Sequence, residues 1–383
     1  MTYFFDFINP LIYSTIYYIV LFGLCLMIVF KYGVSQDNSN ITRNIPITQV
    51  VATIFSIIVI LYIGLRPISG PAFIDMPLYA HTYNHFYDGS LGGTDDVRGE
   101  WIFYWFGNTC KRLGLIDREY FLAIAVVYFG LMAVTCWRLM RNNMFVALLF
   151  CFISFQCLTF GTNGLRNGMA SSIMMLAITF LNKENKWQII IALFLMYISI
   201  NIHKSLSLPG LCAIIAFIAI KETKYAIYFW IASILISAVA GNLVTQFFVN
   251  LGFDDRMEGY ANLDEFGEVK ESVNVKAGFR IDFILYSIMP IIMAWYVTIK
   301  RNFKDNMYNI IANTYILSNA FWVMVIRSNQ SNRFAYLSWF IYPLVIAYPL
   351  LRMNIWEDQD KKLAIILLLY SGFTFFMEFI YYG

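Results

Sequence analysis

The chain has 383 residues, of which 60% are hydrophobic and 13% are charged, with a formal net charge of +3. No soluble domain can bury that much apolar surface, so the composition excludes a soluble enzyme and indicates a polytopic membrane protein. The small net charge gives no sign of a nucleic-acid partner.

Spanning helices need about 20 mostly apolar residues each. The segments that meet or approach this length are 11–30, 47–65, 120–138, 144–160, 164–181, 187–202, 206–220, 225–243, 281–299, 308–326, 334–351 and 363–381. Cytoplasmic loops are enriched in lysine and arginine, and every second connection here is basic, which predicts that both chain ends are external. We therefore expect an all-α bundle of about 12 transmembrane helices, forming a single transmembrane domain over 1–383.

Two longer external segments interrupt this pattern. The first, about 66–119, has a Gly- and Asp-rich centre between two aromatic stretches, 77–87 and 101–110, which we predict to be short interfacial helices. The second, about 244–280, is the most polar part of the chain, and we interpret it as a lid over an external opening.

The most informative stretch is 161–178, GTNGLRNGMASSIMMLAI. Gly164, Gly168 and Ser172 recur every four residues, which is typical of close helix packing in membranes. Arg166 lies near the start of this helix and projects roughly opposite the small residues. A guanidinium near hydrocarbon needs a counter-charge, water or a ligand, so Arg166 is a candidate functional residue.

Further cations lie at predicted external helix ends, where the positive-inside rule makes them exceptions. They are Arg66, Arg280, Arg327 and Arg333, together with His203 and Lys204 in the turn NIHKS. The helices beside His203 are short, so this turn is predicted to lie below the outer surface, in an outward-facing cavity lined with cations. For each arginine, the alternative is an anchor to lipid headgroups.

These residue types suit a lipid-linked pyrophosphoryl sugar. Guanidinium groups bind phosphate oxygens bidentately, and a histidine suits a general base. Asn329 and its polar neighbours, with the aromatic residues of the first external segment, suit sugar binding. The spacing of His81 and His85 is compatible with a metal ligand pair, but three tyrosines share that spacing and favour an aromatic belt, so we predict no metal and no cofactor.

The sequence also resembles a known family, the polytopic Wzy-type or EpsG-type polymerases of O-antigen, capsule and exopolysaccharide. The resemblance is carried by LRPISGPAFIDMPLYAHTYNHF, GEWIFYWFGNTCKRLG, NGLRNGMASSIMMLAI, NIHKSLSLP and SNRFAYLSWFIYPL. The positions that match the family's charged and aromatic residues are Arg66, Asp75, Tyr79, Arg166, His203, Lys204 and Arg333.

The resemblance implies a GT-C-like membrane bundle in the bacterial cytoplasmic (inner) membrane, with its active site on the periplasmic or external face. It implies transfer of a glycan from undecaprenyl pyrophosphate to another lipid-linked repeat unit, and a chain-length regulator and a flippase as pathway partners. Within that reaction we expect Arg166, Arg280 and Arg333 to neutralise the leaving pyrophosphate. His203 would be the base, with Asp75 as the alternative, and Arg66 would either bind substrate or hold Asp75.

Two alternatives stay open. One is an O-antigen ligase-like transferase, with the same donor and a lipid A core as acceptor. The other is a flippase of lipid-linked oligosaccharide, which predicts pseudo-symmetric halves and charges near the membrane midplane. The sequence leaves undecided the sugar repeat, its linkage, the oligomeric state and the identity of the base.

Overall fold

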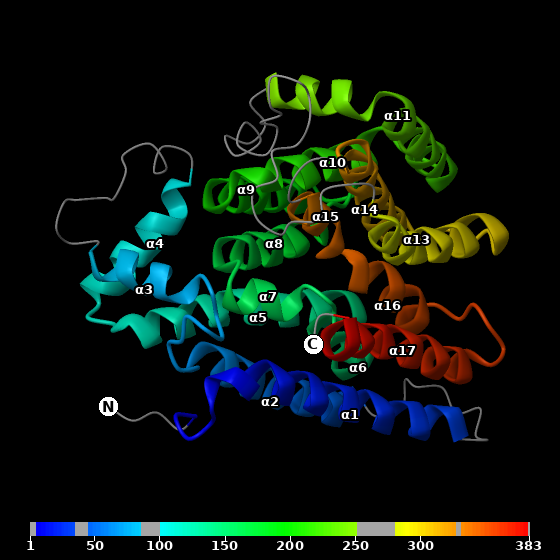
Figure 1. Cartoon of the computed structure of the whole chain (residues 1–383). Helices are drawn as coiled ribbons and strands as arrows, with labels where there is room; N and C mark the ends of the chain where they lie inside the picture. The colour runs from blue at the N-terminus through cyan, green and yellow to red at the C-terminus, as the bar shows by residue number, and fades with distance from the viewer. Residues whose placement is uncertain (1–4, 35–44, 86–99, 251–279, 327–330, 382–383) are drawn as a thin grey trace. The chain divides into compact units, whose positions relative to one another are not determined.

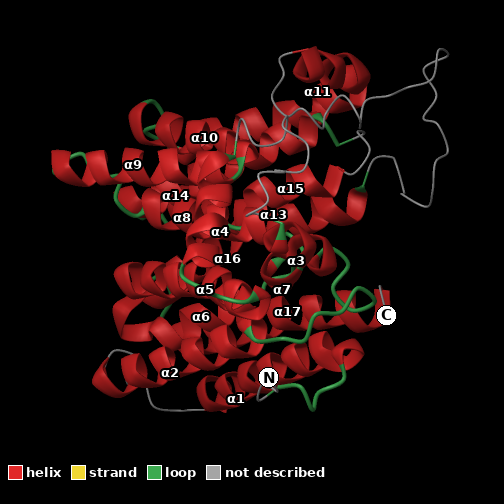
Figure 2. Ribbon diagram, turned by 90° about the vertical axis from the view of Figure 1, so that its left-hand side faces the viewer, coloured by secondary structure: helices red, strands yellow, loops and turns green. Residues whose placement is uncertain are grey.

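The computed structural model describes residues 5–34, 45–85, 100–250, 280–326 and 331–381. Throughout these ranges the chain forms helices and loops, and Figure 2 shows no strand among them. The stretches in these ranges that are long and apolar enough to cross a membrane are Pro10–Gly33, Asp117–Phe152, Ile281–Lys300, Arg333–Arg352 and Gln359–Tyr381. Shorter apolar helices are Gln49–Gly64, Lys186–Ile202, Lys204–Ile218 and Thr223–Val239. The prediction of a helical, multi-pass membrane protein is confirmed at this level.

Lipid contact explains the surface of these helices. Val50, Ile54 and Ile58 lie on one side of a single helix and are each more than half exposed. Water-soluble proteins rarely expose contiguous apolar rows of this kind. The exposed apolar faces therefore fit a hydrocarbon environment.

The chain forms two compact units, one made of Met1–His203 with Ala347–Gly383 and the other of Lys204–Ile346. The helices of the first unit are α1 (Tyr13–Val34), α2 (Ile45–Gly64), α3 (Met76–Asn84), α4 (Trp101–Arg112), α5 (Asp117–Met140), α6 (Met144–Phe152), α7 (Cys157–Thr162), α8 (Leu165–Ile178), α9 (Lys186–Ile202) and α17 (Gln359–Phe376). In Figure 1, α1 and α17 pack side by side although they come from opposite ends of the sequence. Phe22 and Phe375 stack at 4.6 Å between ring centroids at this contact.

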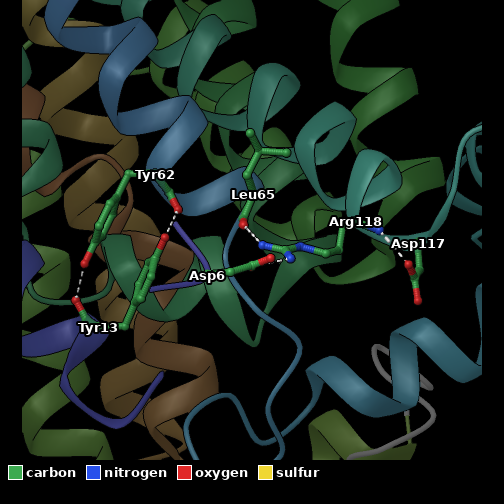
Figure 3. A network of polar contacts seen from close by, with 6 residues as sticks. All are labelled: Asp6, Tyr13, Tyr62, Leu65, Asp117 and Arg118. Carbon is green, nitrogen blue, oxygen red and sulfur yellow. Dashed lines mark hydrogen bonds and ion pairs between the residues drawn. The ribbon is translucent and has the colours of Figure 1, made fainter. Parts of the chain in front are cut away.

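A polar network fixes three helix ends in the first unit (Figure 3). Arg118, in the first turn of α5, donates to the Leu65 carbonyl at the end of α2 and pairs with Asp6 at 2.5 Å. Tyr13 and Tyr62 stack at 4.1 Å, and each hydroxyl donates to the other residue's carbonyl. These contacts hold the start of the segment that carries α3 and α4.

The second unit contains α10 (Ser207–Ile218), α11 (Thr223–Asn250), α13 (Ile281–Trp295), α14 (Asn306–Met324) and α15 (Ser331–Trp339), and α16 (Tyr342–Arg352) begins in it. α14 is the central helix, since it packs against α10, α11, α13 and α15. Its buried Asn319 accepts from Trp230 at 2.8 Å and donates to Ser338 at 3.0 Å. Paired polar groups of this kind add specificity to an otherwise apolar core.

The helix boundaries differ from the sequence prediction in three places. The segment predicted as one helix over 144–160 is broken between α6 and α7, where Ser154 and Gln156 are buried in the connection. The segment 334–351 contains a turn at Phe340 and Ile341 between α15 and α16. α11 continues to Asn250, into the segment that was predicted to be an external loop. The two aromatic stretches of the first external segment are helical, as predicted, in α3 and α4.

Candidate active site

The small residues of α8 allow the helix to lie directly against α7. A Cβ added at Gly168 would lie 2.6 Å from the Phe160 carbonyl oxygen, and one at Gly164 would lie 3.2 Å from the Phe160 ring. Only glycine fits the first of these positions without a shift of the backbone. The small-residue seam therefore packs against α7, and Arg166, between the two glycines in sequence, points to a different neighbour.

The pairing of α8 with α9 brings Arg166 and His203 to the same level. These helices are joined by a short loop and pack closely, so they run antiparallel. The Ser199 hydroxyl donates to the Ala170 carbonyl at 2.7 Å. Arg166 lies one turn before Ala170, and His203 lies one turn after Ser199, where its own N–H caps α9 on the Ser199 carbonyl. The two sequence-predicted residues therefore meet because of one helix–helix register.

They meet on the carboxylate of Glu100, which directly precedes α4. Arg166 Nη1 lies 2.6 Å from Glu100 Oε2, and His203 Nδ1 lies 2.5 Å from Glu100 Oε1. The three side chains are 19%, 6% and 9% exposed for Arg166, His203 and Glu100, respectively. A buried carboxylate is stable only where it is paired and hydrogen-bonded, and the N-terminal end of α4 adds a favourable helix dipole.

Arg166 has further polar neighbours from α3 and α4. Tyr79 and Tyr104 both lie close to its guanidinium. A guanidinium carries five N–H donors, so the contacts to Glu100 and Tyr79 do not exhaust its capacity to bind an anion. Tyr79, predicted from the sequence as a substrate contact, thus belongs to the same cluster.

The charges in the cluster define the state of the imidazole. Because Glu100 is paired with Arg166, it is ionised and can only accept hydrogen bonds. His203 Nδ1 must therefore be the donor, which leaves Nε2 as the ring nitrogen able to accept a proton when the imidazole is neutral. A carboxylate that fixes a histidine in this way is the arrangement by which general-base histidines are oriented.

A second link joins the same two helix ends. Trp101 Nε1 donates to Asn201 Oδ1 at 2.8 Å, and Asn201 Nδ2 donates to the Tyr197 carbonyl at 2.8 Å. Glu100 and Trp101 are consecutive, and Asn201 is two residues from His203. The start of α4 and the end of α9 are therefore held together by two side-chain contacts.

Arg66 lies outside the cluster and is completely buried. It donates to the Ile63 carbonyl at 2.6 Å and to the Thr162 carbonyl at 3.0 Å, with its guanidinium 5.3 Å from the ring centroids of Phe73 and Phe121. Burial lowers the pKa of Arg66 to about 9, so the group remains charged at neutral pH. Its hydrogen bonds go to main-chain carbonyls and not to Asp75. These bonds tie the end of α2 to α7.

Asp75 and Lys204 are exposed, and Asp75 precedes α3. The Asp75 N–H lies 3.5 Å from Asn163 Oδ1, beside the turn that leads into α8. The rings of His81 and His85 lie 4.1 Å apart between centroids and are tilted by 30°, and His85 Nδ1 lies 2.8 Å from the His81 carbonyl oxygen. The choice of Asp75 as the alternative base stays a prediction.

Other predicted site residues belong to the second unit or fall outside the described ranges. Arg280 pairs with Asp282 at 2.5 Å and stacks on Phe283 at 3.8 Å, and Arg333 is exposed on α15. Their joint action with Arg166 stays a prediction. Arg327, Asn329 and most of the acidic segment predicted as a lid lie outside the described residues.

Glu100 is the residue that the sequence analysis missed. It lies in a motif that supports the family resemblance. Nothing in the sequence pairs it with Arg166, which is 66 positions away, or with His203, which is 103 positions away. The available signal was the need of Arg166 for a counter-charge, combined with a carboxylate directly before an aromatic helix.

A comparison with known families gives a match over most of the chain. A model of the EpsG family matches residues 49–383, which include most of α2 and every residue of the cluster. No curated protein and no solved structure matches the chain. The match extends over most of the chain, and the protein is a member of the EpsG family, a family of Wzy/EpsG-type polysaccharide polymerases.

Proposed function

We propose that this protein is a membrane glycosyltransferase that polymerises undecaprenyl-pyrophosphate-linked oligosaccharides, with the Arg166–Glu100–His203 cluster as its catalytic centre. The observation that carries the proposal is that Arg166 and His203, from two helices, both contact the buried carboxylate of Glu100, at 2.6 and 2.5 Å respectively. The sequence singled out Arg166 and His203 as functional for chemical reasons, and family membership supports the reaction class.

His203 acts on the acceptor in this mechanism. A hydroxyl of the acceptor sugar lies against Nε2, which takes its proton as the oxygen bonds to the anomeric carbon of the donor. Glu100 accepts from Nδ1 throughout, so the imidazolium formed at this moment is stabilised by an adjacent negative charge.

Arg166 acts on the donor. As the new glycosidic bond forms, the bond from the anomeric carbon to the pyrophosphate oxygen breaks, and the electron pair leaves with the lipid pyrophosphate. The guanidinium binds the developing charge through donors that Glu100 does not use. Arg280 and Arg333 are candidates for binding the second phosphate, and Lys204, Arg327 and Asn329 are candidates for other substrate contacts.

The wider setting belongs to the same proposal. The bundle has about 12 membrane passages in a GT-C-like arrangement within the bacterial inner membrane, and the cluster faces the periplasmic or external side. The turn at His203 lies below that surface, in a cavity that admits the lipid-linked substrate.

Gene deletion in the host, followed by a gel of the surface glycan, tests the reaction class. We expect the deletion strain to show single repeat units in place of a ladder. The wild-type gene and a gene with His85→Ala should restore the ladder, whereas a gene with His203→Ala should not. His85 is a matched control because it lies on α3's C-terminal end, outside the cluster. A lipid A core that carries no glycan at all would instead indicate a ligase. Loss of the glycan from the surface, with its accumulation inside the cell, would indicate a flippase.

A further inference from the structure

Trp101 combines exposure with a fixed orientation. The residue is 45% exposed although its indole N–H is hydrogen-bonded to Asn201 at 2.8 Å. Because the polar edge of the ring is used in that bond, the exposed surface is mostly aromatic carbon. Asn201 uses its own amide N–H on the Tyr197 carbonyl, so both polar groups of this side chain serve to hold the indole in place.

A tryptophan in a membrane-interface belt behaves differently. Its ring lies in the apolar zone while its N–H reaches water or headgroups. At Trp101 the N–H is directed to another helix. Trp105, one turn further along α4, is 60% exposed, and no such side-chain bond holds it among the described contacts. Trp105 fits the belt, whereas the geometry of Trp101 needs another explanation.

The position of Trp101 relative to the cluster explains its fixed orientation. Glu100 directs Oε2 to Arg166 and Oε1 to His203, so the donor-binding cation and the base are held by different oxygens of the carboxylate. Trp101 is bonded to α9, the helix that ends at His203. The indole is therefore associated with the base, and hence with the acceptor sugar.

We infer that Trp101, oriented by Asn201, is the stacking platform of the acceptor subsite, where it binds the pyranose ring whose hydroxyl is deprotonated by His203. This inference rests on the proposed function and deepens it. Aromatic faces carry negative partial charge, and the C–H groups on one face of a pyranose carry positive partial charge, so a rigid indole orients the sugar ring at little entropic cost. The platform thereby selects which ring of the acceptor presents its hydroxyl to Nε2.

The test uses the purified full chain in liposomes, with lipid-linked repeat units extracted from the host as both donor and acceptor. Trp101→Leu should raise the KM for the repeat units about tenfold, with a smaller fall in kcat, since the stacking energy is lost while the base remains. Trp101→Phe should recover part of the affinity that Trp101→Leu loses. Asn201→Ala should bind the repeat units more weakly than the wild type, because the indole is no longer held. Trp105→Leu, the matched control, should leave both constants unchanged.

Equal KM values for Trp101→Leu and Trp105→Leu would overturn the inference while the proposed polymerase stands. A wild-type protein that makes no polymer would overturn the proposed function instead. In that case the platform is judged by binding of the repeat-unit oligosaccharide, released from its lipid by mild acid, to wild type and to Trp101→Leu. Indistinguishable binding to the two proteins would reject the platform as well.

Discussion

The substitution Glu100→Gln removes the charge at the centre of the cluster while keeping the size of the side chain. A glutamine has one acceptor oxygen, whereas Arg166 and His203 both donate to Glu100. If the oxygen stays with Arg166, the amide N–H₂ faces His203 Nδ1, which must then accept. The proton moves to Nε2, and the imidazole can no longer take a proton from the acceptor.

The expected magnitudes follow from this geometry. Breaking a buried ion pair costs roughly 3–5 kcal/mol, and we expect the lower end because the Arg166 side chain keeps 19% exposure and can bind water. Imposing the wrong tautomer on a base histidine lowers kcat by about 10⁴-fold in serine proteases, and a similar loss is expected here.

Thermal unfolding in detergent and polymerisation in liposomes measure the two effects separately. Glu119→Gln is the matched control, since Glu119 accepts a hydrogen bond from the Ile116 N–H at 3.0 Å and an amide oxygen can replace it. This control should keep wild-type stability and rate. Wild-type values for Glu100→Gln in both assays would refute the assignment of Glu100 as the residue that positions the base.

Three further substitutions test separate parts of the account. Arg166→Lys should lose most polymerising activity while the protein still inserts, because an ammonium keeps the charge but lacks the guanidinium fork; polymers of normal length on the surface-glycan gel would make Arg166 an anchor only. His203→Gln should lower kcat by about 10²–10⁴-fold with little change in donor binding, and near-normal turnover in liposomes would move the base to Asp75. Gly168→Ala should destabilise the protein by about 1–3 kcal/mol, since its Cβ would lie 2.6 Å from the Phe160 carbonyl oxygen. Unchanged thermal unfolding of that variant would contradict the close packing of α7 and α8.

The sequence predicted two residues of the cluster, Arg166 and His203, but not the contact that joins them. Arg166 stood out because an unpaired cation near hydrocarbon is costly, and His203 stood out because it lies in a polar turn between short helices. Both arguments are local. Glu100 is 66 and 103 positions away from its two partners, and only the folded chain brings it between them.

Helix breaks and buried charges illustrate the same limit. Gln156 in an apolar run is a visible sign that the segment 144–160 is interrupted, but hydropathy averages over it. The sequence predicts that Arg66, a charged residue after a helix, either binds substrate or holds Asp75. The structure shows Arg66 buried beside Phe73 and Phe121, where its two terminal nitrogens donate to the Ile63 and Thr162 carbonyls. Sequence alone could not distinguish these roles, since both require a charged residue at a helix end.

The most direct measurement is polymerisation by the purified protein in liposomes supplied with lipid-linked repeat units alone. We expect the wild type to produce a ladder of lipid-linked glycans and to release undecaprenyl pyrophosphate, and we expect neither product from a protein that carries Glu100→Gln. A wild-type protein that is correctly folded and leaves the repeat units unjoined would contradict the proposed polymerase activity. A full ladder from the Glu100 variant would contradict the assignment of the site.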